Sequence, residues 1–153
     1  MGTVDDRSKL DTTIDPQSGQ QKNYLVLSEE ERAKGFVRPV RTTYVHVGRR
    51  QPENLRDLTD AEKELWGGQG YAKFEEYPAS RAPATGRFWT QAELDSIGKG
   101  CKAKTTMGIA IAETYARTPT FYSGTFCVGC RTHLPVGEDG ELVWDGTNER
   151  VGT

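Results

Sequence analysis

The sequence predicts an α+β fold made of about four short helices and small β elements, preceded by an extended polar arm. Three observations lead to this prediction. Only 35% of the 153 residues are hydrophobic and 17 are glycine, so much of the chain is expected to form turns and irregular segments. Three Ser/Thr-x-x-Glu sequences mark helix starts. Short runs of β-branched and aromatic residues, typical of strands, lie between these starts.

The first 23 residues form the arm, and residues 24–153 are expected to form a single α+β domain. Beyond the initiator methionine, the arm has only Val4, Leu10 and Ile14 as sizeable aliphatic residues. A segment this polar cannot build a core of its own. It is therefore either a disordered tail or an arm that a partner subunit orders.

The first half of the domain alternates short helices with strands. A capping box at residues 28–31 predicts a helix that ends at Gly35, and residues 36–47 are expected to form a strand that Pro39 confines to a sheet edge or interrupts. A second capping box at residues 59–62 predicts a helix through Trp66. Residues 71–77 are expected to be a strand and residues 78–86 a loop.

The second half is expected to hold two more helices and a β region. The capping box at residues 90–93 predicts a helix that ends at Gly98. Thr105 or Thr106 is expected to cap a longer helix that runs to about Arg117 and has one apolar face. The stretch from residue 120 onward reads as β, with a C-terminal hairpin signalled by the turn at residues 139–140.

Six cations and no acid lie between residues 32 and 50, and they suggest a basic strip made of Arg38, Arg41, Arg49 and Arg50. Such a strip could bind phosphates or an acidic protein surface. Charged residues also protect exposed strand edges against aggregation, and that plainer interpretation is kept beside the first.

The cysteines carry the strongest chemical signal in the sequence. An odd number of cysteines argues against a disulfide framework. Cys127 and Cys130 form a Cys-x-x-Cys turn, and His133 follows three residues later. Cys101, in a glycine-flanked loop, is the only other thiol. Zinc prefers four ligands of this kind, so these four residues are predicted to form a structural Cys3His zinc site.

Three alternatives to this ligand set stay open. His46 could replace His133 as the fourth ligand. Cys127 and Cys130 could be a redox pair, although Pro135 excludes the continuing helix that such chemistry prefers. The cysteines could also be plain buried residues. A structural ion would compensate for the small core, since zinc contributes on the order of 10 kcal/mol in small peptides.

The sequence contains none of the common catalytic motifs for nucleotide binding, metal-dependent hydrolysis or serine hydrolysis. The protein is therefore predicted not to be an enzyme. The absence of a long apolar run and of a basic, apolar start predicts no membrane segment and no secretory signal. The net charge of −2 gives no global reason to bind nucleic acid.

Several segments together resemble a family of small proteins, without an established activity, that tailed bacteriophages and prophages encode. The resemblance covers most of the chain from about Tyr24 onward. The segments that carry it are residues 35–41 with Tyr44 and His46, residues 85–90, 100–101 and 112–115, and residues 126–135 (Phe-Cys-Val-Gly-Cys-Arg-Thr-His-Leu-Pro) through 144–146. Arg131 departs from the glycine that usually follows a zinc-knuckle Cys-x-x-Cys.

The resemblance implies a viral protein located in the virion or the host cytoplasm. The leading hypothesis is a zinc-stabilised virion component, such as a capsid decoration or accessory protein, whose partners are capsid proteins or further copies of itself. The alternative is an intracellular phage effector, either an inhibitor of host defence or a nucleic-acid-binding accessory that uses the basic strip.

Overall fold

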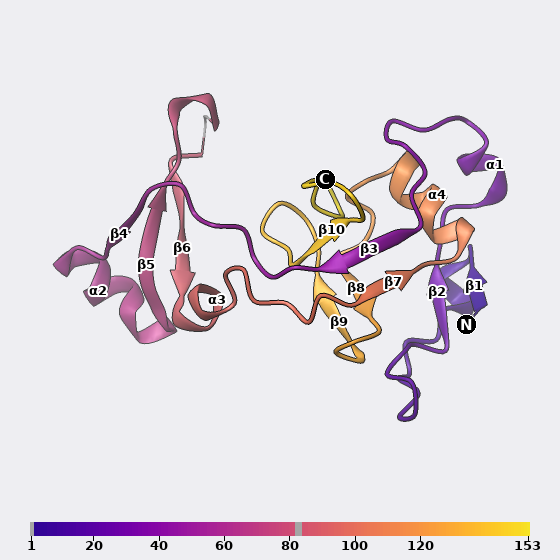
Figure 1. Ribbon diagram of the computed structural model, residues 1–153, viewed down its shortest axis with the longest axis horizontal. Coiled ribbons are helices and arrows are strands. Elements are labelled where there is room, and N and C mark those ends of the chain that lie inside the picture. Colours follow the sequence, from indigo (N-terminus) through magenta and orange to yellow (C-terminus); the bar gives the residue numbers. More distant parts are fainter. Residues whose placement is uncertain (1, 82–83) are drawn as a thin grey trace. The chain divides into compact units, whose positions relative to one another are not determined.

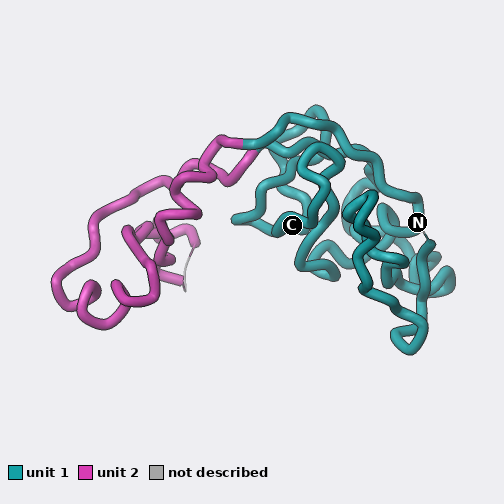
Figure 2. The backbone as a smooth tube through the Cα atoms, turned by 90° about the horizontal axis from the view of Figure 1, so that it is seen from below, with its two compact units in different colours: residues 1–47, 100–153 teal, residues 48–99 magenta. Residues whose placement is uncertain are grey.

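The computed structural model describes residues 2–81 and 84–153 and has a mixed α+β fold with short helices and small sheets (Figure 1). Its contacts divide the chain into two compact units, coloured separately in Figure 2. Unit 1 consists of residues 1–47 and 100–153, and unit 2 consists of residues 48–99. Unit 2 is thus inserted into unit 1. Every helix in the described ranges is too short or too polar to cross a lipid bilayer.

Unit 1 contains three small sheets. A parallel pair joins β1 (Gly2–Val4) to β2 (Asn23–Leu25). A three-stranded antiparallel sheet has β3 (Thr43–His46) at its centre, between β7 (Lys104–Thr106) and β10 (Leu142–Trp144). An antiparallel hairpin joins β8 (Gly124–Cys127) to β9 (Thr132–Pro135). The helices of this unit are η1 (Arg7–Lys9), α1 (Glu29–Arg32) and α4 (Ile109–Arg117).

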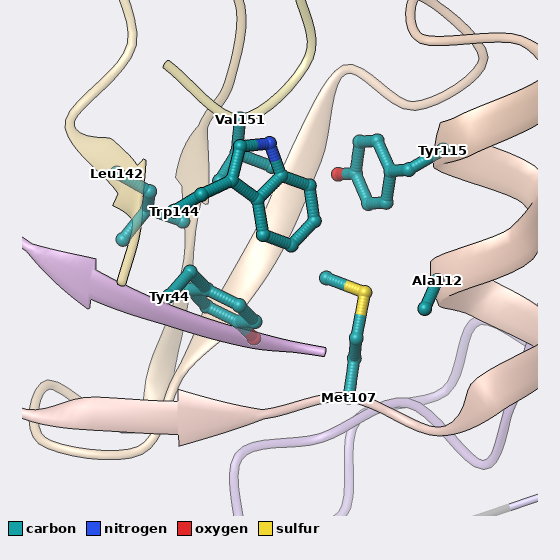
Figure 3. Close-up of a cluster of buried hydrophobic side chains, with 7 residues drawn as sticks. All are labelled: Tyr44, Met107, Ala112, Tyr115, Leu142, Trp144 and Val151. Carbon is teal, nitrogen blue, oxygen red and sulfur yellow. The ribbon is translucent and has the colours of Figure 1, made fainter. Parts of the chain in front are cut away.

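An aromatic cluster forms the core of unit 1 (Figure 3). Trp144 of β10 meets the ring of Tyr44 from β3 edge-on, and it meets the ring of Tyr115 from α4 in the same way. Met107 and Val151 pack into the same cluster. This core therefore joins the central sheet to α4 and the C-terminal segment, and it supports the end of β3, which carries His46.

Unit 2 is built around the antiparallel sheet β4 (Leu55–Asp57), β5 (Tyr71–Glu76) and β6 (Gly86–Thr90). Its helices are α2 (Asp60–Trp66), η2 (Gly67–Gln69), η3 (Ala79–Arg81) and α3 (Gln91–Asp95). The side chains of Trp89 and Glu75 are completely buried. Arg50 holds the Glu75 carboxylate with two hydrogen bonds of 2.8 and 2.9 Å, and the Trp89 indole donates a third.

The helix starts confirm the capping-box predictions at Thr59 and Thr90, where both reciprocal hydrogen bonds form. At Ser28 the side chain accepts a hydrogen bond from the Glu31 amide, which is half of such a box. The expected start of the longest helix was wrong. Residues 104–106 pair with β3 as a strand, so α4 begins only after Gly108.

Two expectations about strands also need correction. The strand expected over residues 36–47 is limited to Thr43–His46, because the stretch around Pro39 lies exposed outside the ladder. The turn at residues 139–140 leads into β10, which pairs with β3 and not with the strand before it. The hairpin near the C-terminus is instead β8–β9, and its turn carries the Cys-x-x-Cys sequence.

Candidate metal centre

Four side chains of unit 1 converge into a cluster that could hold a metal ion: His46, Cys101, Cys127 and Cys130. Their ligand atoms all lie within 4.8 Å of one another. The Sγ atoms of Cys101 and Cys127 are 3.4 Å apart, and the Cys130 Sγ lies 3.4 Å from the His46 Nδ1. All three cysteines are free thiols.

The central sheet brings these residues together from distant parts of the sequence. His46 is the last residue of β3, where it pairs with Leu142 of β10. The backbone amide of Lys102 donates a 2.9 Å hydrogen bond to the His46 carbonyl, which places Cys101 beside the end of β3. Cys127 ends β8, and Cys130 lies in the turn that leads to β9. Both segments of unit 1 therefore contribute to the cluster: residues 1–47 provide the histidine, and residues 100–153 provide the three cysteines.

Gly129 allows the two cysteine loops to approach each other. A Cβ atom at this position would lie 2.6 Å from the Cys101 Sγ and 2.7 Å from the Ala103 Cβ. Both distances are shorter than real Cβ contacts allow. The absence of a side chain at Gly129 is thus a condition for the close packing of the sulfur atoms.

The residues that follow Cys101 and Cys130 both have a left-handed backbone conformation. Lys102 follows Cys101 with φ 63°, and Arg131 follows Cys130 with φ 55°. This conformation is costly for residues with a side chain and is normally left to glycine. Arg131 therefore adopts a backbone conformation that glycine takes most easily. Its amide also donates a 2.7 Å hydrogen bond to the Cys127 carbonyl, which closes the turn.

His46 presents one definite ring nitrogen to the cysteines. Its Nε2 lies 2.9 Å from the Glu141 carboxylate, which accepts hydrogen bonds and donates none when ionised. Its Nδ1 lies 3.3 Å from the Cys101 amide, which can only donate. Both partners place the proton on Nε2 and the lone pair on Nδ1. A carboxylate behind a histidine in this way is the usual outer support of a metal ligand.

The thiols differ in their ease of ionisation. Burial opposes ionisation of Cys101, but hydrogen bonds from the Ala103 amide and the other two thiols outweigh it and lower its pKa to about 7. Burial, together with the neighbouring sulfur atoms of Cys101 and Cys127, raises the pKa of Cys130 to about 12. Metal binding requires thiolates, so a bound cation would have to displace the Cys130 proton.

The structure places His133, the histidine predicted as the fourth ligand, outside this cluster. The ring lies in β9, where its Nε2 is 2.9 Å from the Tyr24 hydroxyl, and it packs edge-on against Phe126. Phe126 and His133 are paired across the hairpin, which directs His133 toward β2. The histidine beside the three cysteines is His46, the alternative. Strand alternation was its sequence signal, since Tyr44 and His46 are the two buried residues of β3.

The four arginines of the expected basic strip are divided between the units and engaged individually. In unit 1, Arg41 pairs with Glu149 and lies over the Trp144 ring, and Arg38 donates to the Thr153 carbonyl at 3.3 Å. In unit 2, Arg50 holds the buried Glu75, and Arg49 lies 3.7 Å from Glu93. Three of the four therefore neutralise carboxylates of the same chain.

Comparison with protein-family models, with curated proteins and with solved structures finds no match to this chain.

Proposed function

We propose that His46, Cys101, Cys127 and Cys130 bind a structural zinc ion, and that the protein acts by binding other proteins. The clustering of these four donors carries the proposal. Tetrahedral zinc with bonds of about 2.3 Å to sulfur would place two sulfurs about 3.8 Å apart. The observed 3.4 Å between Cys101 and Cys127 is close to that value, so small side-chain movements are enough to admit the ion.

Four protein ligands fill the coordination sphere that zinc adopts in structural sites. No position would then be open for water or substrate, which supports a structural role for the ion over a catalytic one. The ion would join the end of β3, the loop before β7 and the β8–β9 turn. The ion would add a further connection between these elements, so metal binding would couple to the stability of the fold.

The proposed mode of action is protein binding on a virion, as a capsid decoration or accessory component of a tailed phage. Exposed apolar residues in the segment before β3 support protein binding, with Phe36 43% and Val37 59% exposed. The resemblance to phage-encoded proteins supports the viral setting. Because most of the basic strip is held by carboxylates of this chain, we favour protein over nucleic acid as the partner.

Elemental analysis of the purified protein tests the metal site. We expect one zinc ion per chain, lost in Cys127→Ser and in His46→Ala. His133→Ala is the matched control and should retain the ion, because this histidine bonds to Tyr24 instead. Loss of zinc from His133→Ala but not from His46→Ala would contradict the proposed ligand set.

Proteomics of purified phage particles tests the role. A virion component should be present in a fixed ratio to the capsid protein and stay bound through density-gradient purification. A protein found only in the soluble fraction of infected cells would contradict the virion proposal. That outcome would leave the zinc site standing, since the elemental analysis decides it separately.

A further inference from the structure

Beneath the N-terminal arm lies a cavity of about 260 Å³, which we call the arm cavity. Thr3 of β1 and Tyr24 of β2 contribute to one side of it. Tyr44 of β3, Met107 and Ile111 before and within α4, and Phe126 of β8 contribute to the rest. All of these residues belong to unit 1. The cavity is partly open to solvent, so a small molecule can reach it.

The size of the cavity limits the occupant to a small molecule. A void of about 150 Å³ in a protein core is enough to hold one benzene molecule, whereas pockets for drug-sized ligands start at about 300 Å³. The arm cavity falls between these values. It can therefore take one or two fused rings.

The walls are aromatic and uncharged. The aromatic residues Tyr24, Tyr44, Tyr122 and Phe126 line the cavity together with apolar residues and with uncharged polar ones, and none of the described residues that line it is charged. The polar ones are Thr3, Gln20, Thr105, Thr106 and Thr125. Burial raises the pKa of Tyr24, Tyr44 and Tyr122, so these phenols stay protonated at neutral pH. A charged ligand would lose its hydration without gaining an ionic partner, which excludes it on energetic grounds.

The polar lining residues can accept hydrogen bonds from a ligand. The Tyr44 hydroxyl donates to the Phe126 carbonyl, and the Tyr122 hydroxyl donates to the Leu25 carbonyl at 2.6 Å. Each phenol has a single proton, and these bonds use it, so neither phenol can donate to a ligand. The Tyr44 and Tyr122 oxygens also receive hydrogen bonds from Thr105 and Thr114. An N–H or O–H group of a ligand would therefore be accepted by side-chain oxygens of the other polar lining residues, such as Gln20 and Thr3.

From this chemistry we infer that the arm cavity is a binding site for an uncharged aromatic compound of one or two rings that carries a hydrogen-bond donor. Residues of the arm border the site. The start of the arm is attached to β2 by three residue pairs and by a 2.8 Å hydrogen bond from the Val26 amide to the Val4 carbonyl. A limited opening of the arm would admit the ligand, and closure would remove it from water.

Indole is the probe for this site, and NMR of the full-length protein is the measurement. We expect saturable shifts in the signals of Met107 and of the tyrosine and phenylalanine rings that line the cavity. Benzofuran has the same shape but lacks the N–H donor, and indole-3-carboxylate adds a charge. Both should bind at least tenfold more weakly than indole. Equal binding of indole and benzofuran would overturn the donor requirement, and the absence of saturable shifts with indole would overturn the site.

A pair of variants on one helix locates the binding. Ile111 lines the cavity, whereas Ile109, two residues earlier in α4, is 60% exposed and does not. Ile111→Trp should weaken indole binding at least tenfold, and Ile109→Trp should leave it unchanged. Equal effects of the two variants would contradict the assignment. If Ile111→Trp does not fold, the positions of the shifts in the native protein decide, and shifts confined to residues outside the cavity overturn the inference.

Discussion

Replacing Glu141 tests whether the cluster is built to hold a metal ion. This residue does not ligate in the proposed site. It accepts a 2.9 Å hydrogen bond from the His46 Nε2, and the two side chains are 14% and 7% exposed. Glu141→Ala would remove the acceptor and its charge. The Cys101 amide would then be the one hydrogen-bond partner described for the His46 ring that still fixes its orientation, so the ring could rotate or change its protonated nitrogen more easily.

The expected loss of zinc affinity follows from the burial of this pair. Outer-shell partners of metal-bound histidines typically contribute a factor of about 10 to 100 in affinity, or about 1.4 to 2.7 kcal/mol. The pair is well shielded from water, so we expect Glu141→Ala to fall in the upper half of this range. Glu141→Gln keeps an oxygen that can accept from Nε2 but loses the charge, so its effect should be at most about tenfold.

Competition against a chromophoric zinc chelator at pH 7 measures these affinities. Glu138→Gln is the control, because Glu138 is an exposed acid three residues earlier. It should bind zinc like the native protein. If Glu141→Ala binds zinc as tightly as the Glu138 control, the carboxylate does not support the histidine and the reasoning from hydrogen-bond geometry is refuted.

Three further predictions concern other contacts. Glu75→Gln should lower the free energy of unfolding measured with urea by about 3–5 kcal/mol, because it removes the charge of a completely buried carboxylate that accepts hydrogen bonds from Arg50 and Trp89. The exposed Glu76→Gln should cost at most about 1 kcal/mol. Gly129→Ala should destabilise the zinc-bound protein by about 1–3 kcal/mol, because the new Cβ would lie 2.6 Å from a sulfur atom, while Gly108→Ala, whose Cβ would meet no atom within 4 Å, should be tolerated. In metal-free protein at pH 7, Cys101 should react first with iodoacetamide, as peptide mapping can show, because its pKa is about 7.

Each of these predictions has a clear contrary result. Similar losses from the two glutamate variants would show that the buried ion pair contributes little. Undisturbed zinc affinity and stability in Gly129→Ala would show that the loops can separate without consequence. Faster alkylation of Cys130 than of Cys101, in metal-free protein that keeps its native circular dichroism spectrum, would contradict the lowered pKa of Cys101.

Local signals in the sequence predicted the helix starts and part of the site. The capping boxes at Thr59 and Thr90 depend on residues three positions apart, and both form. The meeting of Cys101 with Cys127 and Cys130 was predicted from ligand chemistry, since no other thiol exists in the chain. These features depend on neighbours in sequence or on the scarcity of a residue type.

Features that depend on pairing between distant strands could not be predicted in the same way. Residues 104–106 carry helix-capping threonines, yet pairing with β3 outweighs that local preference. His133 is close to Cys130 in sequence, but the register of β8 and β9 places it opposite Phe126. His46 reaches the cysteines because β3 lies between β7 and β10, an order that spacing alone does not reveal. Sequence distance was therefore a poor guide to which histidine lies beside the three cysteines.

The points at which the chain passes between unit 1 and unit 2 bear on which parts of the sequence can be replaced. The chain leaves unit 1 after Val47, directly after His46, and re-enters it at Gly100, directly before Cys101. Within unit 2 the two ends run together, since Arg49 bridges to Ile97 and a Cβ on Gly48 would lie 2.3 Å from the Lys99 amide nitrogen. A bound ion would connect His46 and Cys101, the residues next to the two ends of the inserted segment. Segments of different length or sequence could then replace residues 48–99 without disturbing the surrounding fold, which makes this junction a natural point for exchanging one module for another.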